Sequence, residues 1–160
     1  IDADDLWDES FLETMTQTIQ QSFGFVFASY RRCDEFSLQP IYTDFIVPEK
    51  VNYLDILKTN SISCLTAFID IKKLGKELMP NVRYRQDMGL WLKYLKQIPY
   101  AIGVKQVLAT YRICSNSHSR KKSKLLVPQW YFYRKVEKLS IVFSIYLMII
   151  WAYRGFLKYN

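Results

Sequence analysis

Carboxylates dominate the first residues of the chain. The segment Ile1-Asp2-Ala3-Asp4-Asp5-Leu6-Trp7 carries three acids within four positions, directly before an amphipathic stretch. In an extended backbone, side chains alternate between two sides, so Asp2 and Asp4 project to the same side. Neighbouring carboxylates repel one another unless a cation or donors lie between them, and a divalent ion that also binds phosphate needs only one or two of them. These acids indicate either a divalent-metal site or the start of a helix, where negative charge suits the helix dipole.

A second candidate acid, Asp87, lies far along the chain. Gln86 and Asp87 open a predicted helix after a turn, with Arg83 and Arg85 close by. One carboxylate in such a place can act as a general base that takes the proton of a substrate hydroxyl. The alternative is an ordinary exposed acid near a helix N-terminus. The residue types alone leave both interpretations open.

The order of these and other short motifs resembles that of bacterial family-two glycosyltransferases of the GT-A fold, the group that builds surface polysaccharides. Residues 2–7 resemble the D-x-D-D-x-W segment of that family, and the other matches follow in family order. They are Ser29-Tyr30, Val47-Pro48, Tyr53–Leu57, Asn60-Ser61-Ile62, Gln86-Asp87 before Leu90-Trp91-Leu92, and Tyr111-Arg112 before Asn116-Ser117. The resemblance is to the C-terminal portion, beginning at the D-x-D motif. It implies that the nucleotide-binding half that precedes this motif in the family is missing here.

The resemblance also implies roles for particular residues. Asp4, together with Asp2, would hold Mg²⁺ or Mn²⁺ on the donor diphosphate, and Asp2 would also contact the ribose. Asp87 would be the catalytic base of an inverting transfer, and Arg112 would lie near the diphosphate. The family often has a His two residues after that Arg, where this chain has Cys114. The residues expected on the acceptor side are Asn60, Ser61, Gln86 and Trp91.

Apolar patterns predict the elements that position these residues. Helices are predicted over residues 10–22, 53–57 and 86–96, and buried strands over residues 23–30 and 63–70. Residues 31–49 are predicted as a hairpin or loop excursion, and residues 101–104 and 107–111 as two short strands of a hairpin around Lys105-Gln106. This alternation indicates an α/β layered domain over residues 1–114. Residues 115–160 are predicted as a basic connector and a helical tail.

The tail carries the basic character of the chain. Residues 120–160 contain nine Lys or Arg and one acid, although the whole chain has a formal charge of only +7. Helices are predicted over residues 127–138 and 139–159, and the uncharged stretch 139–153 is shorter than the roughly 20 apolar residues of a membrane span. We favour an interfacial helix pair on anionic lipid over a helix buried against the domain. The apolar stretch argues against nucleic acid as a partner, because a strand-binding groove needs charge along its path.

The combined prediction is a hexosyltransferase-type glycosyltransferase in surface polysaccharide synthesis. It would transfer a sugar from a nucleotide-diphospho-sugar to a glycan or lipid-linked acceptor. Three scattered cysteines fit reduced thiols, so we expect a cytoplasmic protein peripheral to the inner face of the plasma membrane. The rival hypothesis is an inactive glycosyltransferase fragment, or a membrane-associated interaction module, that lacks the donor-binding half.

Overall fold

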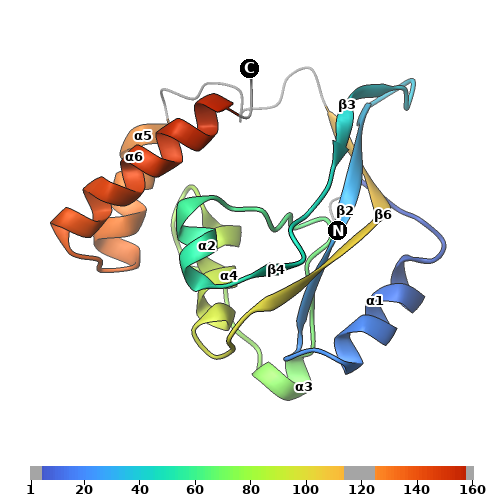
Figure 1. Cartoon of the computed structure of the whole chain (residues 1–160), viewed down its shortest axis with the longest axis horizontal. Helices are drawn as coiled ribbons and strands as arrows, with labels where there is room; N and C mark the ends of the chain where they lie inside the picture. The colour runs from blue at the N-terminus through green and yellow to red at the C-terminus, as the bar shows by residue number, and fades with distance from the viewer. Residues whose placement is uncertain (1–4, 114–124, 158–160) are drawn as a thin grey trace.

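The computed structural model describes residues 5–113 and 125–157 (Figure 1). The elements follow the chain in this order: β1 (Leu6–Trp7), α1 (Phe11–Gln20), β2 (Phe25–Asp34), β3 (Pro40–Phe45), β4 (Lys50–Val51), α2 (Tyr53–Lys58), β5 (Phe68–Ile69), α3 (Ile71–Leu74), α4 (Gln86–Leu95), β6 (Ala101–Ile113), α5 (Leu126–Tyr131), the π-helical turn η3 (Phe132–Val136) and α6 (Ile141–Leu157).

A mixed sheet lies at the centre of the described structure. Its strand order is β1-β6-β2-β3, while β4 also pairs with β6 and β5 with β2. β2 and β6 run parallel, and the other strand pairs are antiparallel. Helix α1 lies on one side of the sheet, and α2 and α4 lie on the other, with α5 and α6 beyond them (Figure 1). The predicted α/β class is confirmed.

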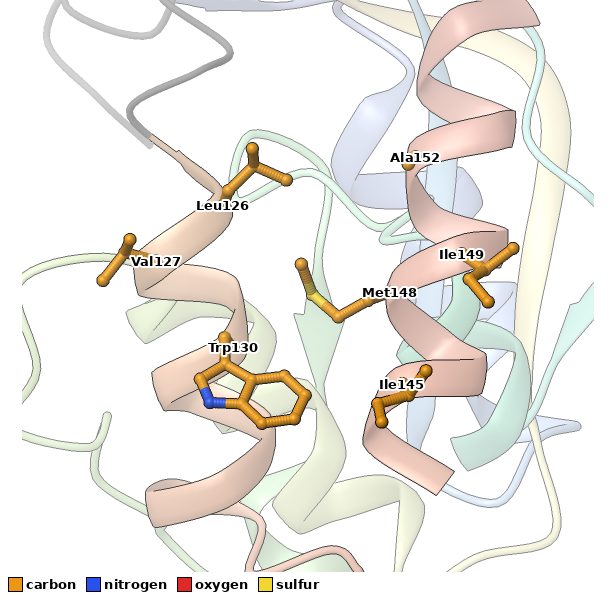
Figure 2. A pocket seen from close by; sticks show the side chains of 7 residues that line it. All are labelled: Leu126, Val127, Trp130, Ile145, Met148, Ile149 and Ala152. Carbon is orange, nitrogen blue, oxygen red and sulfur yellow. The ribbon is translucent and has the colours of Figure 1, made fainter. Parts of the chain in front are cut away.

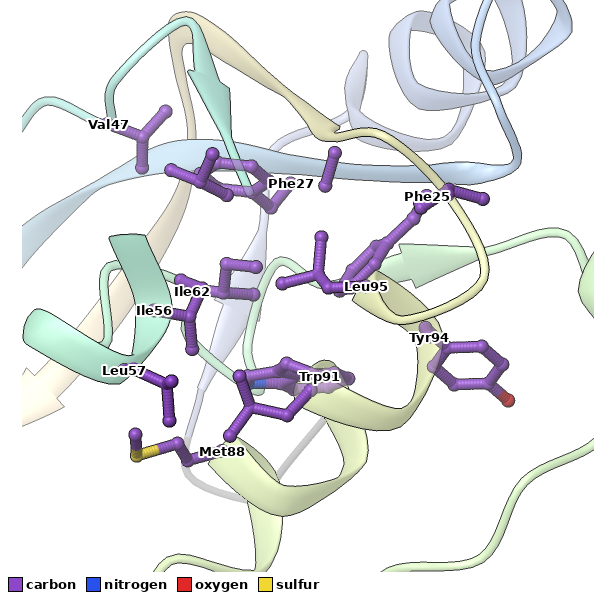
Figure 3. Close-up of a cluster of buried hydrophobic side chains, with 14 of the residues drawn as sticks. Phe25, Phe27, Val47, Ile56, Leu57, Ile62, Met88, Trp91, Tyr94 and Leu95 are labelled. Atoms are coloured by element: carbon purple, nitrogen blue, oxygen red, sulfur yellow. The ribbon is translucent and has the colours of Figure 1, made fainter. Parts of the chain in front are cut away.

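Strand β2 is buried on both of its faces. Phe25 and Phe27 pack into the larger hydrophobic cluster with α2 and α4, whereas Val26 and Ala28 pack into a smaller cluster with α1. The alternation follows from the two-residue period of a strand, which turns successive side chains to opposite faces. Figure 3 shows Phe25 and Phe27 above the side chains of α2 and α4. The strand predicted over residues 23–30 is confirmed as β2, and this strand separates the cluster under α1 from the cluster under α4.

The hairpin predicted around Lys105-Gln106 is wrong. Residues 101–113 form one strand, β6, which pairs in parallel with β2 from Ile102 to Ile113, with shifts of register on the way. The register shifts where Ala28 pairs with Val104 and the next residue, Ser29, pairs with Val107. The two polar residues therefore form a bulge in a continuous strand. A bulge and a turn can both carry an exposed polar pair, so the sequence pattern does not distinguish them.

Of the other elements predicted before residue 101, the helices and the first hairpin are correct and one strand is not. The three predicted helices are confirmed as α1, α2 and α4, and β3 forms the expected hairpin with β2. The buried strand predicted over residues 63–70 is wrong, because only Phe68 and Ile69 pair with β2. Thr66 and Ala67 instead donate their N–H groups to the Ser63 carbonyl, which makes a turn.

The tail helices pack on the domain through one side. Phe132 and Tyr133 of η3 and Leu147 of α6 are fully buried in the larger hydrophobic cluster. The Tyr133 hydroxyl donates to the Leu57 carbonyl oxygen at 2.5 Å, and the Tyr53 hydroxyl donates to Glu137 Oε2 at 2.6 Å. This side of the tail is therefore buried against the domain, which is the alternative that the sequence analysis did not favour.

The opposite side of the tail is apolar and exposed. Val142 is 79% exposed and Ile149 is 65% exposed, and several neighbours on α6 are exposed to a similar extent. Among the described helices, none combines the length and the apolar character that crossing a membrane requires. The exposed side of the tail is compatible with the interfacial arrangement, which stays a prediction.

Candidate active site

Asp87 lies in the first turn of α4 and is half-buried. Asn60 Nδ2 donates to Asp87 Oδ2 at 3.1 Å, and Asn60 Oδ1 accepts the Ile62 N–H at 3.2 Å. The Asn60 amide is thus held by the backbone of its own loop while it orients the carboxylate. Among the described residues, no hydrogen bond reaches the other carboxylate oxygen, Oδ1. That oxygen is available to a substrate hydroxyl, which is what a general base requires.

Arg85 precedes this helix in a left-handed backbone conformation, with φ of 67°. Its carbonyl oxygen accepts the Gly89 N–H at 2.9 Å, so the residue caps the first turn of α4. Burial lowers the pKa of the Arg85 guanidinium, while the charge of Asp87 opposes that shift. Its Nε hydrogen is buried and has no acceptor in the described part of the chain. A partly desolvated cation therefore lies beside the candidate base.

The tail contributes to the same place. Arg85 Cζ lies 5.7 Å from the centroid of the Trp151 ring of α6, a cation–π contact. One helical turn further, Arg154 Nη1 lies 3.5 Å from Thr59 Oγ1, and Thr59 is the neighbour of Asn60. Helix α6 thereby borders the Asp87 site. The sequence patterns in the tail indicated an apolar helix but gave no sign that Trp151 and Arg154 meet this loop.

The other acceptor-side candidates lie around Asp87 in different ways. Ser61 is half-buried next to Asn60, and Gln86 is half-buried next to Asp87. Trp91 is only 3% exposed and packs against Phe25 at a ring-centroid distance of 5.5 Å (Figure 3). The core placement of Trp91 does not favour contact with an acceptor, so that role stays a prediction without structural support.

The acidic segment and the predicted phosphate-side segment meet across β1 and β6. Leu6 pairs with Thr110 and Trp7 with Ala109. Asp5 is 7% exposed, and its Oδ1 accepts the backbone N–H of Arg112 at 3.1 Å. The structure thus brings Asp5 and Arg112 together although 107 positions separate them. Asp5 satisfies a backbone donor here, which is a structural role.

The loop between α2 and β5 connects these two sites. At one end Asn60 contacts Asp87, and at the other the Leu65 carbonyl oxygen accepts the Trp7 indole N–H at 2.8 Å. The Thr66 hydroxyl donates to the Ala28 carbonyl oxygen at 2.9 Å, which fixes the loop to β2. The predicted donor side and the predicted acceptor side therefore flank one loop, residues 59–67.

The predicted metal site cannot be placed within this geometry. Asp2 and Asp4 lie outside the described residues, as do Cys114 and His118. In the described part of the chain, no group of three or more His, Cys, Asp or Glu residues is arranged to hold a metal ion. Metal binding by Asp2 and Asp4 stays a prediction.

Comparison with known proteins supports the resemblance seen in the sequence. The chain is 34% identical over 95% of its length to a candidate teichuronic acid biosynthesis glycosyltransferase of Bacillus subtilis. It is 31% identical over 81% of its length to the UDP-Glc:alpha-D-GlcNAc-diphosphoundecaprenol beta-1,3-glucosyltransferase of Escherichia coli, and 28% identical over its full length to an uncharacterized glycosyltransferase of Haemophilus influenzae. No family model matches the chain.

The matches cover only part of each relative. The chain spans 60% of the Bacillus protein, 51% of the Escherichia protein and 64% of the Haemophilus protein. Its described residues nevertheless place the Asp87 carboxylate, the Asn60 amide and Arg85 at the N-terminus of α4, and Arg154 contacts Thr59 of the adjoining loop. Over nearly its whole length, then, the chain is similar to bacterial glycosyltransferases, and these relatives support a glycosyltransferase family for it.

Proposed function

We propose that this chain forms the acceptor-side portion of an inverting, GT-A-type glycosyltransferase. The enzyme would transfer one hexosyl group from a nucleotide-diphospho-sugar to a glycan or lipid-linked acceptor in surface polysaccharide synthesis. The observation that carries the proposal is the Asp87 carboxylate, because Asn60 orients one of its oxygens and the other is left for a substrate. Similarity to named glycosyltransferases along most of the chain supports the reaction class.

Asp87 is the proposed catalytic base of this reaction. Its carboxylate takes the proton of the acceptor hydroxyl as that oxygen forms a bond to the anomeric carbon of the donor sugar. The bond between the anomeric carbon and the diphosphate oxygen breaks on the opposite side, and the nucleoside diphosphate leaves with its electron pair. The hydrogen bond from Asn60 holds the carboxylate in one orientation, and this lowers the entropic cost of reaching the reactive geometry.

The donor side of the proposal rests on the resemblance. Asp4 and Asp2 would hold Mg²⁺ or Mn²⁺, and such an ion neutralises charge that develops on a departing diphosphate. Arg112 would lie near the same diphosphate, since Asp5 fixes its backbone on β6. A guanidinium suits this role because its paired donors match phosphate oxygens.

The membrane surface is the proposed location of the enzyme. The exposed side of α6 presents large apolar side chains, including Ile145, Tyr146 and Ile149. Apolar helix faces of this kind lie in the headgroup region of a bilayer when basic residues accompany them. Lys135 in η3 and Lys138 in the turn between η3 and α6 are both exposed. A peripheral position on the cytoplasmic leaflet would give the site access to lipid-linked acceptors.

Substitution of Asp87 by Asn tests the proposed function. We expect kcat to fall by about 10²–10⁴-fold, the usual contribution of a general base, while the affinity for the donor stays unchanged. Donor binding is measured with uridine, guanosine and thymidine diphospho-sugars in the presence of Mn²⁺, on the complete gene product. Asp44→Asn on the exposed edge of β3 serves as the matched control. Absence of binding to every donor by the folded protein would favour the interaction module instead.

A further inference from the structure

Helix α6 presents different residues to each of its surroundings. Met148 faces Trp130 of α5 across an apolar groove (Figure 2), and Val142 is exposed to solvent. The side that meets the domain carries residues spaced by three or four positions, as one face of a helix requires. They are Ser144, Leu147, Trp151 and Arg154. This side of α6 therefore determines what the tail contributes to the candidate site.

The domain-facing side of α6 leads from the hydrophobic core to the Asp87 site. Ser144 and Leu147 are both fully buried, and Leu147 belongs to the larger hydrophobic cluster, so the first half of α6 is fixed on the domain. One turn further along, the Arg85 guanidinium lies over the Trp151 ring, with 5.7 Å between Cζ and the ring centroid. The position of Trp151 beside Arg85 therefore follows from the packing of the helix turn before it.

Arg85 is a cation whose burial depends on its neighbours. Burial lowers the pKa of its guanidinium, and its Nε hydrogen is buried without an acceptor among the described residues. Desolvating a cation is unfavourable unless other groups compensate, and the ion pairs between described residues do not include Arg85. Two groups offer that compensation. The face of the Trp151 ring attracts a cation, and the negative charge of Asp87 raises the pKa of Arg85 against the effect of burial.

We propose that Trp151 is a positioning residue of the transferase, which holds the Arg85 guanidinium beside Asp87 and makes transfer depend on the docked tail. The inference rests on the proposed function, because it takes Asp87 as the base. A nearby positive charge favours the ionised form of a carboxylate, and only that form accepts a proton. An indole ring against the guanidinium keeps water away, and the attraction between opposite charges grows as the effective dielectric constant falls.

Arg85 acts on Asp87 in a way that leaves the carboxylate free to react. The two side chains do not form an ion pair in the described chain, although each charge acts on the other. Asn60 donates to Asp87 Oδ2, so Arg85 does not compete with an acceptor hydroxyl for Oδ1. A cation held slightly apart stabilises the charge of the base without occupying the oxygen that the reaction needs.

Other roles for an indole in the tail predict other positions. A ring that anchors the tail in a bilayer belongs on the outer side of α6, where Tyr146 is 49% exposed. A ring that only fills the core packs among apolar side chains, as Trp91 does next to Phe25. Trp151 is half-buried and meets a cation. Its position therefore matches the positioning of Arg85 better than either of these roles.

Nuclear magnetic resonance tests the position of Arg85 in the complete gene product without any substrate. Because the Arg85 Nε hydrogen is buried, its nitrogen–hydrogen signal should persist at about pH 8, where exposed guanidinium hydrogens exchange quickly with water. The signal that is missing from Arg85→Lys assigns it. We expect Trp151→Leu to remove this protected signal and Trp151→Tyr, which keeps an aromatic face, to retain it. Tyr153→Leu, on the same helix at a residue that is 64% exposed, is the matched control and should also retain it. The proposal is overturned if Trp151→Leu keeps the signal or if the unaltered protein lacks it.

Steady-state kinetics test whether the position of Arg85 matters for transfer. In the transfer assay used for Asp87→Asn, we expect Arg85→Gln and Trp151→Leu each to lower kcat by about tenfold, the effect of one interaction with a charged group, with the donor KM unchanged. Residues that act as one unit are not additive, so the double variant should be no slower than Arg85→Gln alone. Trp151→Tyr should stay within about threefold of the unaltered protein, and Tyr153→Leu within about twofold. Losses that multiply in the double variant mean that Trp151 acts elsewhere, and they overturn the proposal.

Failure of this proposal is distinguishable from failure of the proposed function. Transfer retained by Asp87→Asn overturns the proposed function, whatever the resonance of Arg85 shows. An unchanged Arg85 signal in Trp151→Leu overturns the positioning role, even if Asp87→Asn abolishes transfer. Thermal unfolding of each variant checks the fold. If Trp151→Leu has lost its fold, Trp151→Met, which is flexible and lacks an aromatic face, takes its place with the same expected results.

Discussion

At the Asp5 side of the candidate site, main-chain pairing between β1 and β6 fixes the geometry, whereas at the Asp87 side, one amide side chain from the loop after α2 fixes a single carboxylate. Asp5 uses its oxygen to accept a strand N–H. Asp87 is held by an amide from the loop after α2 and lies near an arginine that α6 covers. We therefore expect substitutions at the Asp5 side to lower stability and substitutions at the Asp87 side to lower catalytic activity. The tail also affects the Asp87 side, because it packs into the hydrophobic core next to α4.

The largest effect is expected from the core contact of the tail. Phe132→Ala removes a ring that is 1% exposed in the cluster shared with α4, so we expect the free energy of unfolding to fall by about 3–5 kcal/mol. Tyr131→Ala, on the exposed side, should change it by less than about 0.5 kcal/mol. Urea denaturation measures both variants. If both variants lowered the free energy of unfolding by the same small amount, the tail would not be part of the core of the domain. The tail would then have no part in the Asp87 side of the site.

The next effect distinguishes the two sides of the site directly. Asn60→Ala removes the group that orients Asp87, so we expect kcat to fall by about tenfold, the size of one charge-assisted hydrogen bond. The KM for the donor should not change, because Asn60 lies on the acceptor side. Steady-state kinetics with varied donor concentration measure both parameters.

Asp5→Ala provides the opposite result for comparison. It removes the acceptor of the Arg112 N–H, so we expect it to lower the free energy of unfolding by about 1–3 kcal/mol. A fall in kcat without a loss of stability in Asp5→Ala would contradict the division between the two sides. So would a loss of donor affinity in Asn60→Ala.

The smallest effect concerns pH. Burial, and then the hydrogen bond to Glu137, raises the pKa of Tyr53 well above its usual value, and burial raises the pKa of Tyr133 to about 12. Because the unfolded tyrosine titrates near about pH 10, its stabilisation is complete below that pH and is lost as the pH rises towards the folded pKa. We expect the free energy of unfolding to decline above about pH 10, and less steeply in Tyr53→Phe.

Denaturant titrations across this pH range check the expectation. Tyr53→Phe also loses one hydrogen bond, so we expect it to be about 1 kcal/mol less stable at neutral pH. Glu137 keeps its 2.7 Å ion pair with Lys96 in that variant. An identical alkaline decline in the two proteins would mean that Tyr53 does not link the tail to the domain.

Much of the fold follows from patterns of single residues. The helices α1, α2 and α4 were predictable because their apolar residues recur with the helical period, and the capping box of Asn52 with Asp55 begins α2 as expected of such a pair. Strand β2 was predictable because it is buried on both faces. These signals are local, and local chemistry alone produces them.

The errors arise where distant pairing decides the structure. The polar pair Lys105-Gln106 marks a bulge, and only the presence of β2 alongside distinguishes it from a turn. Residues 63–70 are apolar enough for a strand, but only Phe68 and Ile69 find a strand to pair with. In α6, apolar residues surround much of the helix, so the pattern does not show which side meets the domain.

The candidate site was predictable in part. Asp87 and Asn60 were both selected from the sequence, and the structure brings them together. Arg85 was visible only as a basic neighbour of Asp87, and its buried donor depends on the packing of η3 and α6. Trp151 and Arg154 had no local signal, because their contact with the site requires the fold of the tail.

Because β2 pairs in parallel with β6, the centre of the sheet cannot form until the ribosome has synthesised β6. Seventy-five positions separate Ser29 from Val104, whose carbonyl oxygen accepts its hydroxyl hydrogen. A ribosome that adds 5–20 residues each second needs roughly 4–15 s to bridge that interval. During this time Phe25 and Phe27 have no β6 beside them and no α4 to cover them. The nascent chain therefore carries an apolar, unpaired strand edge for seconds, a state that favours aggregation and engages chaperones.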